Sequence, residues 1–350
     1  MDMQASENPS SNIPFAQKNV PPAWAKGLLL TTALAAGAWW LGQRFPLVGG
    51  PVFGMLTGLL LRLVWSPGAA YRPGITLCSK QVLQSAVVLL GAGLSLQQVV
   101  ATGSHSLAVM LTTLVVCLLA AFVLGRALKI DPNITTMIGV GTGICGASAI
   151  AAVAPIIEAK EEEVAYAIST IFLFNVAAAL LFPILGRAMG LSDAAFGLWA
   201  GTAVNDTSSV VGAGYAYSQA AGQYATVVKL ARTTLILPVA LGLASYRAYA
   251  AKAGGGIAAK VRIGRLIPWF IPGFLAASLL NTLHVFPAAV LPWLSAVGKF
   301  MIIMAMTAVG LSANLREMVR EGGKPLLLGL LLWATVSITS LLVQGITGQL

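Results

Sequence analysis

Apolar runs of about twenty residues recur along this chain, and they limit its fold more than any other feature. At about 1.5 Å per residue, each run is long enough to cross a hydrocarbon core of roughly 30 Å as a helix. The runs are rich in Ala, Leu, Val and Gly and lack the alternation of barrel strands. With 57% hydrophobic and only 9% charged residues, the sequence predicts an all-α polytopic membrane protein.

Eleven spans are expected, within one transmembrane transporter domain that covers residues 24–350. Residues 1–23 are polar, and we expect a disordered cytoplasmic tail. A cleaved signal peptide is the weaker alternative, because Asp2 and Glu7 precede the first apolar run. The expected spans are 24–43, 47–65, 80–99, 105–127, 133–156, 163–186, 193–217, 222–246, 265–283, 286–312 and 325–347.

The net charge of +10 indicates membrane topology rather than a nucleic-acid partner. With the N-terminus in the cytoplasm, sixteen of the 21 basic residues fall at cytoplasmic ends, as the positive-inside rule requires. This topology places the C-terminus and the 157–163 loop outside, and the 247–265 loop inside. Arg44 and Lys160 are outside, and the sixteen are Lys18, Lys26, Arg62, Arg72, Lys80, Arg126, Lys129, Arg187, Arg247, Lys252, Lys260, Arg262, Arg265, Arg316, Arg320 and Lys324.

Two segments are too rich in glycine and hydroxyl groups to be ordinary spans. GVGTGICGASA (139–149) and GTAVNDTSSVVGAG (201–214) share a Gly-Thr pair followed by a serine. Glycine costs a helix interior about 1 kcal/mol relative to alanine, which predicts two interrupted helices that restart near Gly146 and near Thr207. Close helix packing is the alternative explanation for the glycines, but it does not explain Asn205 and Asp206.

Four charged residues remain inside the expected spans, namely Asp206, Lys229, Arg232 and Lys299. Lys229 and Arg232 are three residues apart and share a helix face. Asp206 can neutralise one cation, or it can act as a helix cap worth about 1 kcal/mol. An excess of positive charge near broken helices favours an anionic substrate.

A repeated GLS motif bears on the architecture. GLSL (93–96) closes one expected span outside, and GLSA (310–313) closes another inside. Motifs of opposite orientation are typical of the inverted repeats of secondary transporters. The three cysteines, Cys78, Cys117 and Cys145, lack metal-ligand spacing, and we expect them to be buried, with no metal or other cofactor.

Four stretches, TGICGASAIAAVAPIIEAKEEEVAYAISTIF, GTAVNDTSSVVGAG, VVKLARTTLILP and MAMTAVGLSANL, resemble the YeiH-type bacterial inner-membrane proteins, a family named for sulfate export. The likeness runs from about residue 50 to the C-terminus. It implies a transporter of a small inorganic or sulfonate-related anion such as sulfate, located in the bacterial inner membrane.

The sequence therefore predicts a secondary transporter, acting as an exporter, in which an anion lies between the two helix breaks. Asn205 and Asp206 are the expected ion-coupling residues, for H⁺ or Na⁺. A sodium/proton antiporter that uses Asp206 is the first alternative, and a membrane-embedded enzyme is the second. Besides the anion and the coupling ion, the expected partner is the lipid bilayer, without nucleic acid, and a homodimer is left open. The expected anion ligands are Gly141, Thr142, Gly143, Gly146, Ser148, Thr207, Ser208, Lys229, Arg232 and Lys299.

Overall fold

The computed structural model describes residues 22–46, 48–254, 268–314 and 323–350, and these parts of the chain are helical without strands. The tail 1–23 therefore lies almost wholly outside the described residues, as does most of the 247–265 loop. Six helices are long and apolar enough to cross a membrane, which supports a membrane protein but not the full count of eleven spans. They cover Arg72–Gly91, Leu96–Ala127, Glu161–Ala188, Gln219–Arg247, Leu291–Ser312 and Gly323–Ile346.

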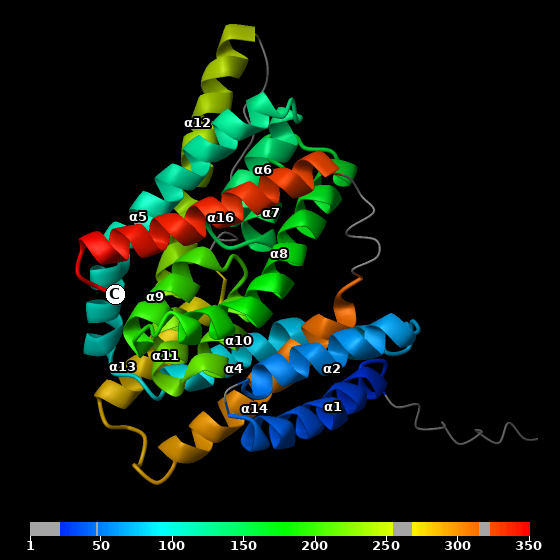
Figure 1. The fold of residues 1–350 in the computed structure, drawn as a ribbon, viewed down its shortest axis with the longest axis vertical. Helices are drawn as coiled ribbons and strands as arrows, with labels where there is room; N and C mark the ends of the chain where they lie inside the picture. Colours follow the sequence, from blue (N-terminus) through cyan, green and yellow to red (C-terminus); the bar gives the residue numbers. More distant parts are fainter. Residues whose placement is uncertain (1–21, 47, 255–267, 315–322) are drawn as a thin grey trace, which may run out of the picture.

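The helices form two groups that pack against each other (Figure 1). In the first group, α2 packs closely on α14, where a Cβ atom at Gly54 would lie 2.9 Å from the carbonyl oxygen of Ile303. Small residues of this kind let membrane helices approach closely. This group holds α1 (Ala25–Arg44), α2 (Gly50–Val64), α3 (Arg72–Leu77), the π-helical turn η1 (Cys78–Val82), α4 (Leu83–Gly91), α13 (Phe270–Thr282) and α14 (Leu291–Ser312).

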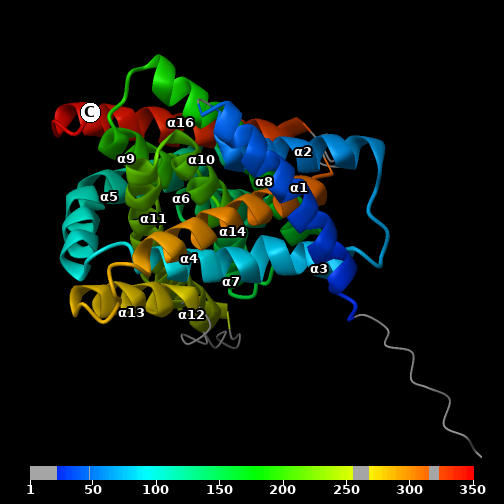
Figure 2. The ribbon, with the colours of Figure 1, turned by 90° about the horizontal axis from the view of Figure 1, so that it is seen from below.

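In the second group, α16 packs along α5 and also contacts α6, α8 and α9. Figure 2 shows α4 and α14 of the first group side by side and α16 on the opposite side of the molecule. The second group holds α5 (Leu96–Ala127), α6 (Pro132–Gly143), α7 (Ala147–Val153), α8 (Glu161–Ala188), α9 (Asp193–Ala203), α10 (Thr207–Tyr217), α11 (Gln219–Thr234), α12 (Ile236–Gly254) and α16 (Gly323–Ile346).

The expected span 80–99 is wrong in its bounds. The helix covers Arg72–Gly91, and α5 begins anew at Leu96. Ser95 and Gln98 form a capping box, in which each side chain bonds the backbone N–H of the other residue. Such a box starts a helix, so GLSL lies between two helices, whereas GLSA ends α14.

The segment 133–156 is interrupted as predicted, but it does not cross the molecule. The Asn133 amide at the start of α6 donates to the Glu163 carboxylate at the start of α8, at 3.2 Å. At the same end, Arg247 donates to the carbonyl oxygen of Ile157 at 2.9 Å. The chain thus enters along α6, reverses, and returns along α7. We call α6–α7 hairpin 1.

The segment 193–217 is a second hairpin, α9–α10, which we call hairpin 2. The Tyr217 hydroxyl at the end of α10 donates to the carbonyl oxygen of Leu191, just before α9, at 2.5 Å. Arg187, at the end of α8, donates to the Tyr217 carbonyl oxygen at 2.7 Å. Because α8 runs from the open end of hairpin 1 to the open end of hairpin 2, the two hairpins enter from opposite ends of the molecule.

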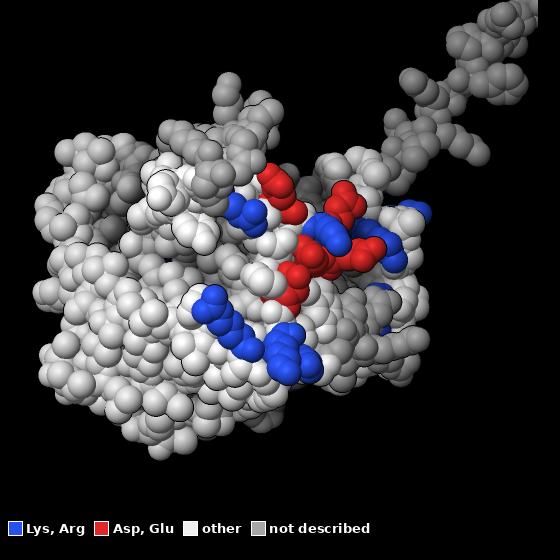
Figure 3. All heavy atoms as spheres, turned by 90° about the horizontal axis from the view of Figure 1, so that it is seen from above, with Lys and Arg blue, Asp and Glu red and all other residues white. Residues whose placement is uncertain are grey.

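This path corrects the expected topology. The 157–163 loop lies at the same end as Asn133 and Arg247, whereas the expected topology placed it opposite Arg247. Arg187 lies at the other end, beside Tyr217. On the face seen from above in Figure 3, acidic and basic side chains gather close together. The expected topology treated each apolar run of about 24 residues as one membrane-crossing helix. Two short antiparallel helices contain the same number of residues.

Candidate functional site

The tips of the two hairpins meet inside the second group of helices. Tip 1 is the turn between α6 and α7, where Gly146 has φ +66° and its N–H bonds the carbonyl oxygen of Gly141 at 2.9 Å. L-residues with side chains rarely adopt this conformation, so glycine permits the reversal. Tip 2 is the turn between α9 and α10, residues 204–206. A Cβ atom at Gly146 would lie 3.5 Å from the Cα atom of Asp206 in tip 2. We call the place where the two tips meet the crossing.

Two cations from α11 lie at the crossing and bond the carbonyl ends of α6 and α9. The Lys229 ammonium donates to the Ile144 oxygen at 2.7 Å, to the Val204 oxygen at 3.3 Å, and to the Asn205 oxygen. Its side chain has no exposed surface. Lys229 therefore joins tip 1 to tip 2.

Arg232 makes a second link of the same kind, one helical turn further along α11. Its guanidinium donates to the Gly143 oxygen at 2.9 Å and to the Thr142 oxygen at 2.8 Å, both in hairpin 1. A longer bond of 3.4 Å reaches the Val204 oxygen in hairpin 2. Arg232 is also fully buried. Neither cation contacts a carboxylate in the described parts of the chain.

The charges at the crossing sum to about +1. The C-terminal ends of α6 and α9 each carry about half a negative charge and the N-terminal ends of α7 and α10 each carry about half a positive charge, so the four helix ends cancel. The Asp206 carboxylate adds −1 when ionised, against +2 from Lys229 and Arg232. The sequence indicated too few acidic partners for these cations, and in the structure main-chain carbonyl groups are their partners instead.

The other side of the crossing presents amide groups instead. Asp206 is the N-cap of α10, and its carboxylate accepts from the Ser208 amide at 2.9 Å and from the Ser208 hydroxyl. The backbone N–H groups of Asn205 and Asp206 both donate to Oδ1 of Asn175 on α8, at 3.1 and 2.8 Å. These bonds hold the irregular backbone of tip 2, because they satisfy two N–H groups that donate to no helical carbonyl group.

The amide side is also the accessible side. Asp206, Thr207 and Ala147 are partly exposed, and Ser148 is exposed. Thr142, in contrast, is fully buried. Three buried polar atoms near the crossing have no hydrogen-bond partner in the structure: Thr142 Oγ1, Asn205 Oδ1 and Ser209 Oγ.

The structure brings most of the predicted site residues together. Gly141 packs against α7, since a Cβ atom there would lie 3.1 Å from Ile150. Lys299 is not part of the crossing: its ammonium donates to Gln219 at 2.7 Å, in a separate pocket of about 310 Å³ between α1, α10 and α14. The residues that do meet at or beside the crossing are Thr142, Gly143, Gly146, Ser148, Asn205, Asp206, Thr207, Ser208, Lys229 and Arg232.

Asn175 is the residue that sequence reasoning missed. It stands alone as an amide in the apolar run IFLFNVAAALL, and it is 3% exposed. A polar residue within a membrane span is a functional candidate by default, so the signal was present in the sequence. The three cysteines are buried and free, as predicted. Among the described residues, no cluster of His, Cys, Asp or Glu could hold a metal ion.

Comparisons with known proteins agree on one family. A family model described as conserved hypothetical protein 698 matches residues 26–329. A UPF0324 membrane protein of Streptococcus pyogenes serotype M6 is 47% identical over 327 residues, which are 91% of this chain and 96% of the relative. Relatives in Streptococcus mutans (44% identical, 92% of this chain, 97% of the relative) and Fusobacterium nucleatum (41%, 92% and 98%) are also named UPF0324 membrane proteins. No solved structure matches this chain.

Proposed function

The chain belongs to the family described as conserved hypothetical protein 698, the YeiH-type UPF0324 membrane proteins, and from this premise we propose that it is a secondary transporter of a small anion. One observation carries the proposal: two hairpins enter from opposite ends and touch at Gly146 and Asp206. Irregular backbone at membrane depth persists only where it is buried in protein or lines a wet cavity. Discontinuous helices that meet at mid-membrane are typical transporter substrate sites.

We place the anion on the amide side of the crossing, beside Ser148, Asp206, Thr207 and Ser208. Helix N-termini and hydroxyl groups donate hydrogen bonds to anions. The carbonyl side is closed, because Lys229 and Arg232 already occupy it. These two residues therefore hold the site together and do not bind the anion directly, and Lys299 belongs to a different pocket.

Coupling follows from the charge balance. The crossing carries about +1 when Asp206 is ionised, so a monovalent anion neutralises it and a divalent anion such as sulfate leaves one uncompensated negative charge. Protonation of Asp206, or binding of Na⁺ to its carboxylate, removes that charge. The proposed transport unit is therefore one divalent anion such as sulfate with one H⁺ or Na⁺.

One observation favours a second candidate function, a cation carrier that uses Asp206. Because the buried cations are satisfied by carbonyl groups, the site does not require an anionic substrate. In this second case the partly exposed Asp206 carboxylate carries the H⁺ or Na⁺ by itself.

The topology belongs to the same proposal. With α1, α2 and α13 crossing in addition to the six long apolar helices, the described chain crosses nine times and includes two re-entrant hairpins. This count keeps the N-terminal and C-terminal ends on opposite sides. Arg126, Lys129, Lys160 and Arg247 lie at the end where hairpin 1 enters, so we place that end in the cytoplasm of a bacterial inner membrane. An inverted repeat produces two hairpins that enter from opposite ends, as these two do.

The test is flux in proteoliposomes. The purified protein is assayed for uptake of labelled sulfate, sulfite and chloride under imposed pH and sodium gradients, with inside-out and right-side-out orientations measured separately. Gradient-driven anion flux that disappears in Asp206→Asn supports the proposal, and net outward flux supports export. Proton or sodium flux without any anion supports the cation carrier. A protein without flux that converts a small molecule chemically would favour the membrane-embedded enzyme.

A further inference from the structure

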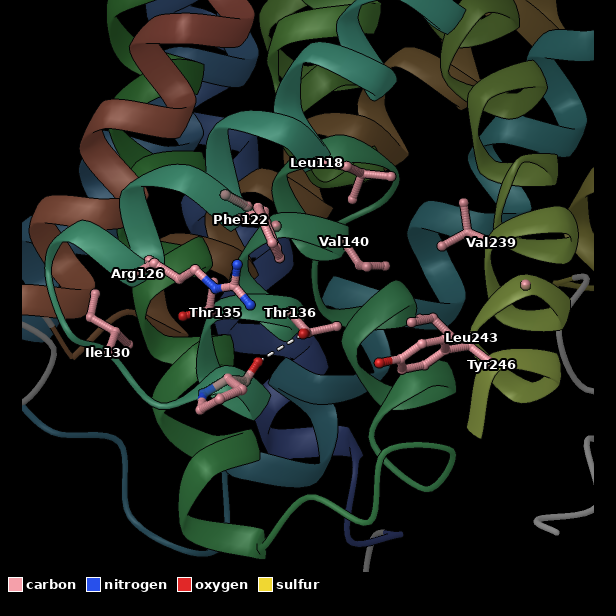
Figure 4. A pocket seen from close by; sticks show the side chains of 15 residues that line it. Leu118, Phe122, Arg126, Ile130, Thr135, Thr136, Val140, Val239, Leu243 and Tyr246 are labelled. Atoms are coloured by element: carbon pink, nitrogen blue, oxygen red, sulfur yellow. Dashed lines mark hydrogen bonds between the residues drawn. The ribbon is translucent and has the colours of Figure 1, made fainter. Parts of the chain in front are cut away.

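A large cavity lies away from the hairpin crossing. It has a volume of about 600 Å³ and is bounded by α5, by the outer side of α6, and by α12. Figure 4 shows Leu118 and Phe122 of α5 and Leu243 and Tyr246 of α12 around it. Lys229, Arg232 and Asp206 are not among its lining residues. The function proposed above therefore leaves this cavity unused.

The walls of the cavity are mostly apolar, and they continue onto a surface that faces lipid. Phe122 is 54% exposed and Tyr246 is 69% exposed, and Leu119 and Val123 beside Phe122 on α5 are exposed as well. Apolar side chains exposed in such numbers along one membrane helix indicate contact with acyl chains. The cavity is thus open to the hydrocarbon region of the bilayer.

One end of the cavity carries a basic side chain and hydrogen-bonding groups. Arg126 lies at the end of α5 with its guanidinium 4.0 Å from the centroid of the Phe122 ring, and the described residues offer its N–H donors no partner. Figure 4 shows Arg126 on one side of the cavity and Tyr246 on the other, with Thr136 between them. The Thr135 hydroxyl is buried, lines the cavity and has no hydrogen-bond partner. None of the lining residues is acidic.

We propose that this cavity binds one anionic phospholipid, with an acyl chain between α5 and α12 and the phosphate group on Arg126. An apolar slot open to the bilayer fits an acyl chain, and it does not fit a small hydrated anion. A guanidinium binds two phosphate oxygens through its planar fork, and basic pockets between membrane helices bind phospholipid head groups. The bound lipid would fill the gap between hairpin 1 and α12, and so support the position of α6.

The chain offers a matched pair of variants that test the acyl-chain slot. Gly242 lines the cavity, and a Cβ atom added there would meet no atom within 4 Å. Gly242→Leu therefore adds a branched side chain to the slot from a position with open space at its Cβ. Gly37 on α1 also has open space around it and is far from the slot in sequence and contacts, so Gly37→Leu is the control for the added bulk.

A second matched pair of variants tests the head-group site. Arg126→Gln removes the cation in the cavity, whereas Lys129→Gln removes an exposed cation three residues later that does not line it. Loss of a charge-assisted hydrogen bond to phosphate predicts about tenfold weaker lipid binding in Arg126→Gln. Lys129→Gln is expected to bind lipid like the unchanged protein.

The measurement is native mass spectrometry of the purified full chain in mild detergent, with phosphatidylglycerol or phosphatidylcholine added. We expect one retained phosphatidylglycerol in preference to phosphatidylcholine, about tenfold less in Arg126→Gln, and none in Gly242→Leu, with Gly37→Leu and Lys129→Gln unchanged. Unfolding temperatures of the four variants identify any that fold poorly. Equal retention of both lipids, or undiminished retention in Gly242→Leu, would overturn the proposal. Displacement of the lipid by excess free sulfate or phosphate would also overturn it and would assign the cavity to small anions.

Discussion

Replacing Lys229 by methionine tests whether the buried cation holds the two hairpin tips together. Methionine has a similar length but cannot donate hydrogen bonds. The carbonyl oxygens of Ile144 and Asn205 then lose the Lys229 ammonium, and the Val204 oxygen keeps only the 3.4 Å bond from Arg232. An unsatisfied buried acceptor costs about 1–3 kcal/mol, so two cost about 2–6 kcal/mol. Part of this cost is offset, because the methionine variant no longer buries an ammonium group, whose desolvation is unfavourable.

We therefore expect the free energy of opening the crossing to fall by about 2–4 kcal/mol. Every 1.4 kcal/mol changes a population tenfold, so the open state should become roughly 30- to 700-fold more populated. Local opening of this kind is measurable without unfolding the whole protein.

Cys145 reports the opening directly, because it lies in tip 1 and is 2% exposed. In a background with Cys78→Ala and Cys117→Ala, the labelling rate of Cys145 by a maleimide is measured in detergent with and without Lys229→Met. Lys299→Met is the matched control, since its ammonium bonds only the Gln219 side chain. Equal labelling rates in the two methionine variants would refute the view that Lys229 joins the hairpins.

Three further predictions concern tip 2 and the topology. Asp206→Asn should fold normally, because Asn caps a helix as well as Asp. Its anion flux should no longer depend on the driving gradient. Full gradient-driven flux in this variant would show that Asp206 serves only as a helix cap. Asn175→Ala should lower the unfolding free energy by about 1–3 kcal/mol, because two buried amides lose their acceptor, and a denaturation midpoint equal to that of the unchanged protein would contradict this. Single cysteines at Glu162 and Tyr249 should label from the same side of intact cells and a cysteine at Gln219 from the other, whereas opposite labelling at 162 and 249 would restore the original topology.

The sequence by itself was sufficient to predict the class of protein and the positions at which its helices break. Hydrophobic runs with few charges need a bilayer, and the four glycines in 139–146 weaken a helix there, which breaks after Gly143. The restarts predicted near Gly146 and Thr207 match the observed starts of α7 and α10. These are local properties, because helix propensity and capping depend on neighbours within one turn.

Tertiary structure alone decided the direction of the chain after each break. A run of 24 residues suits one full crossing or two short helices that reverse, and hydropathy is the same for both. The reversal shows only in long-range bonds, such as Asn133 to Glu163 and Tyr217 to Leu191. For this reason the sequence placed the 157–163 loop and Arg247 at opposite ends, although they lie at the same end.

The roles of Lys229 and Arg232 were also decided by the fold. The sequence showed two cations without enough acidic residues to neutralise them, and this pattern favoured an anionic ligand. Their partners are main-chain carbonyl groups at the ends of α6 and α9. Every residue carries a carbonyl group, so its use as a counter-charge leaves no mark in the sequence. It becomes visible only where two helix ends meet around the same side chain.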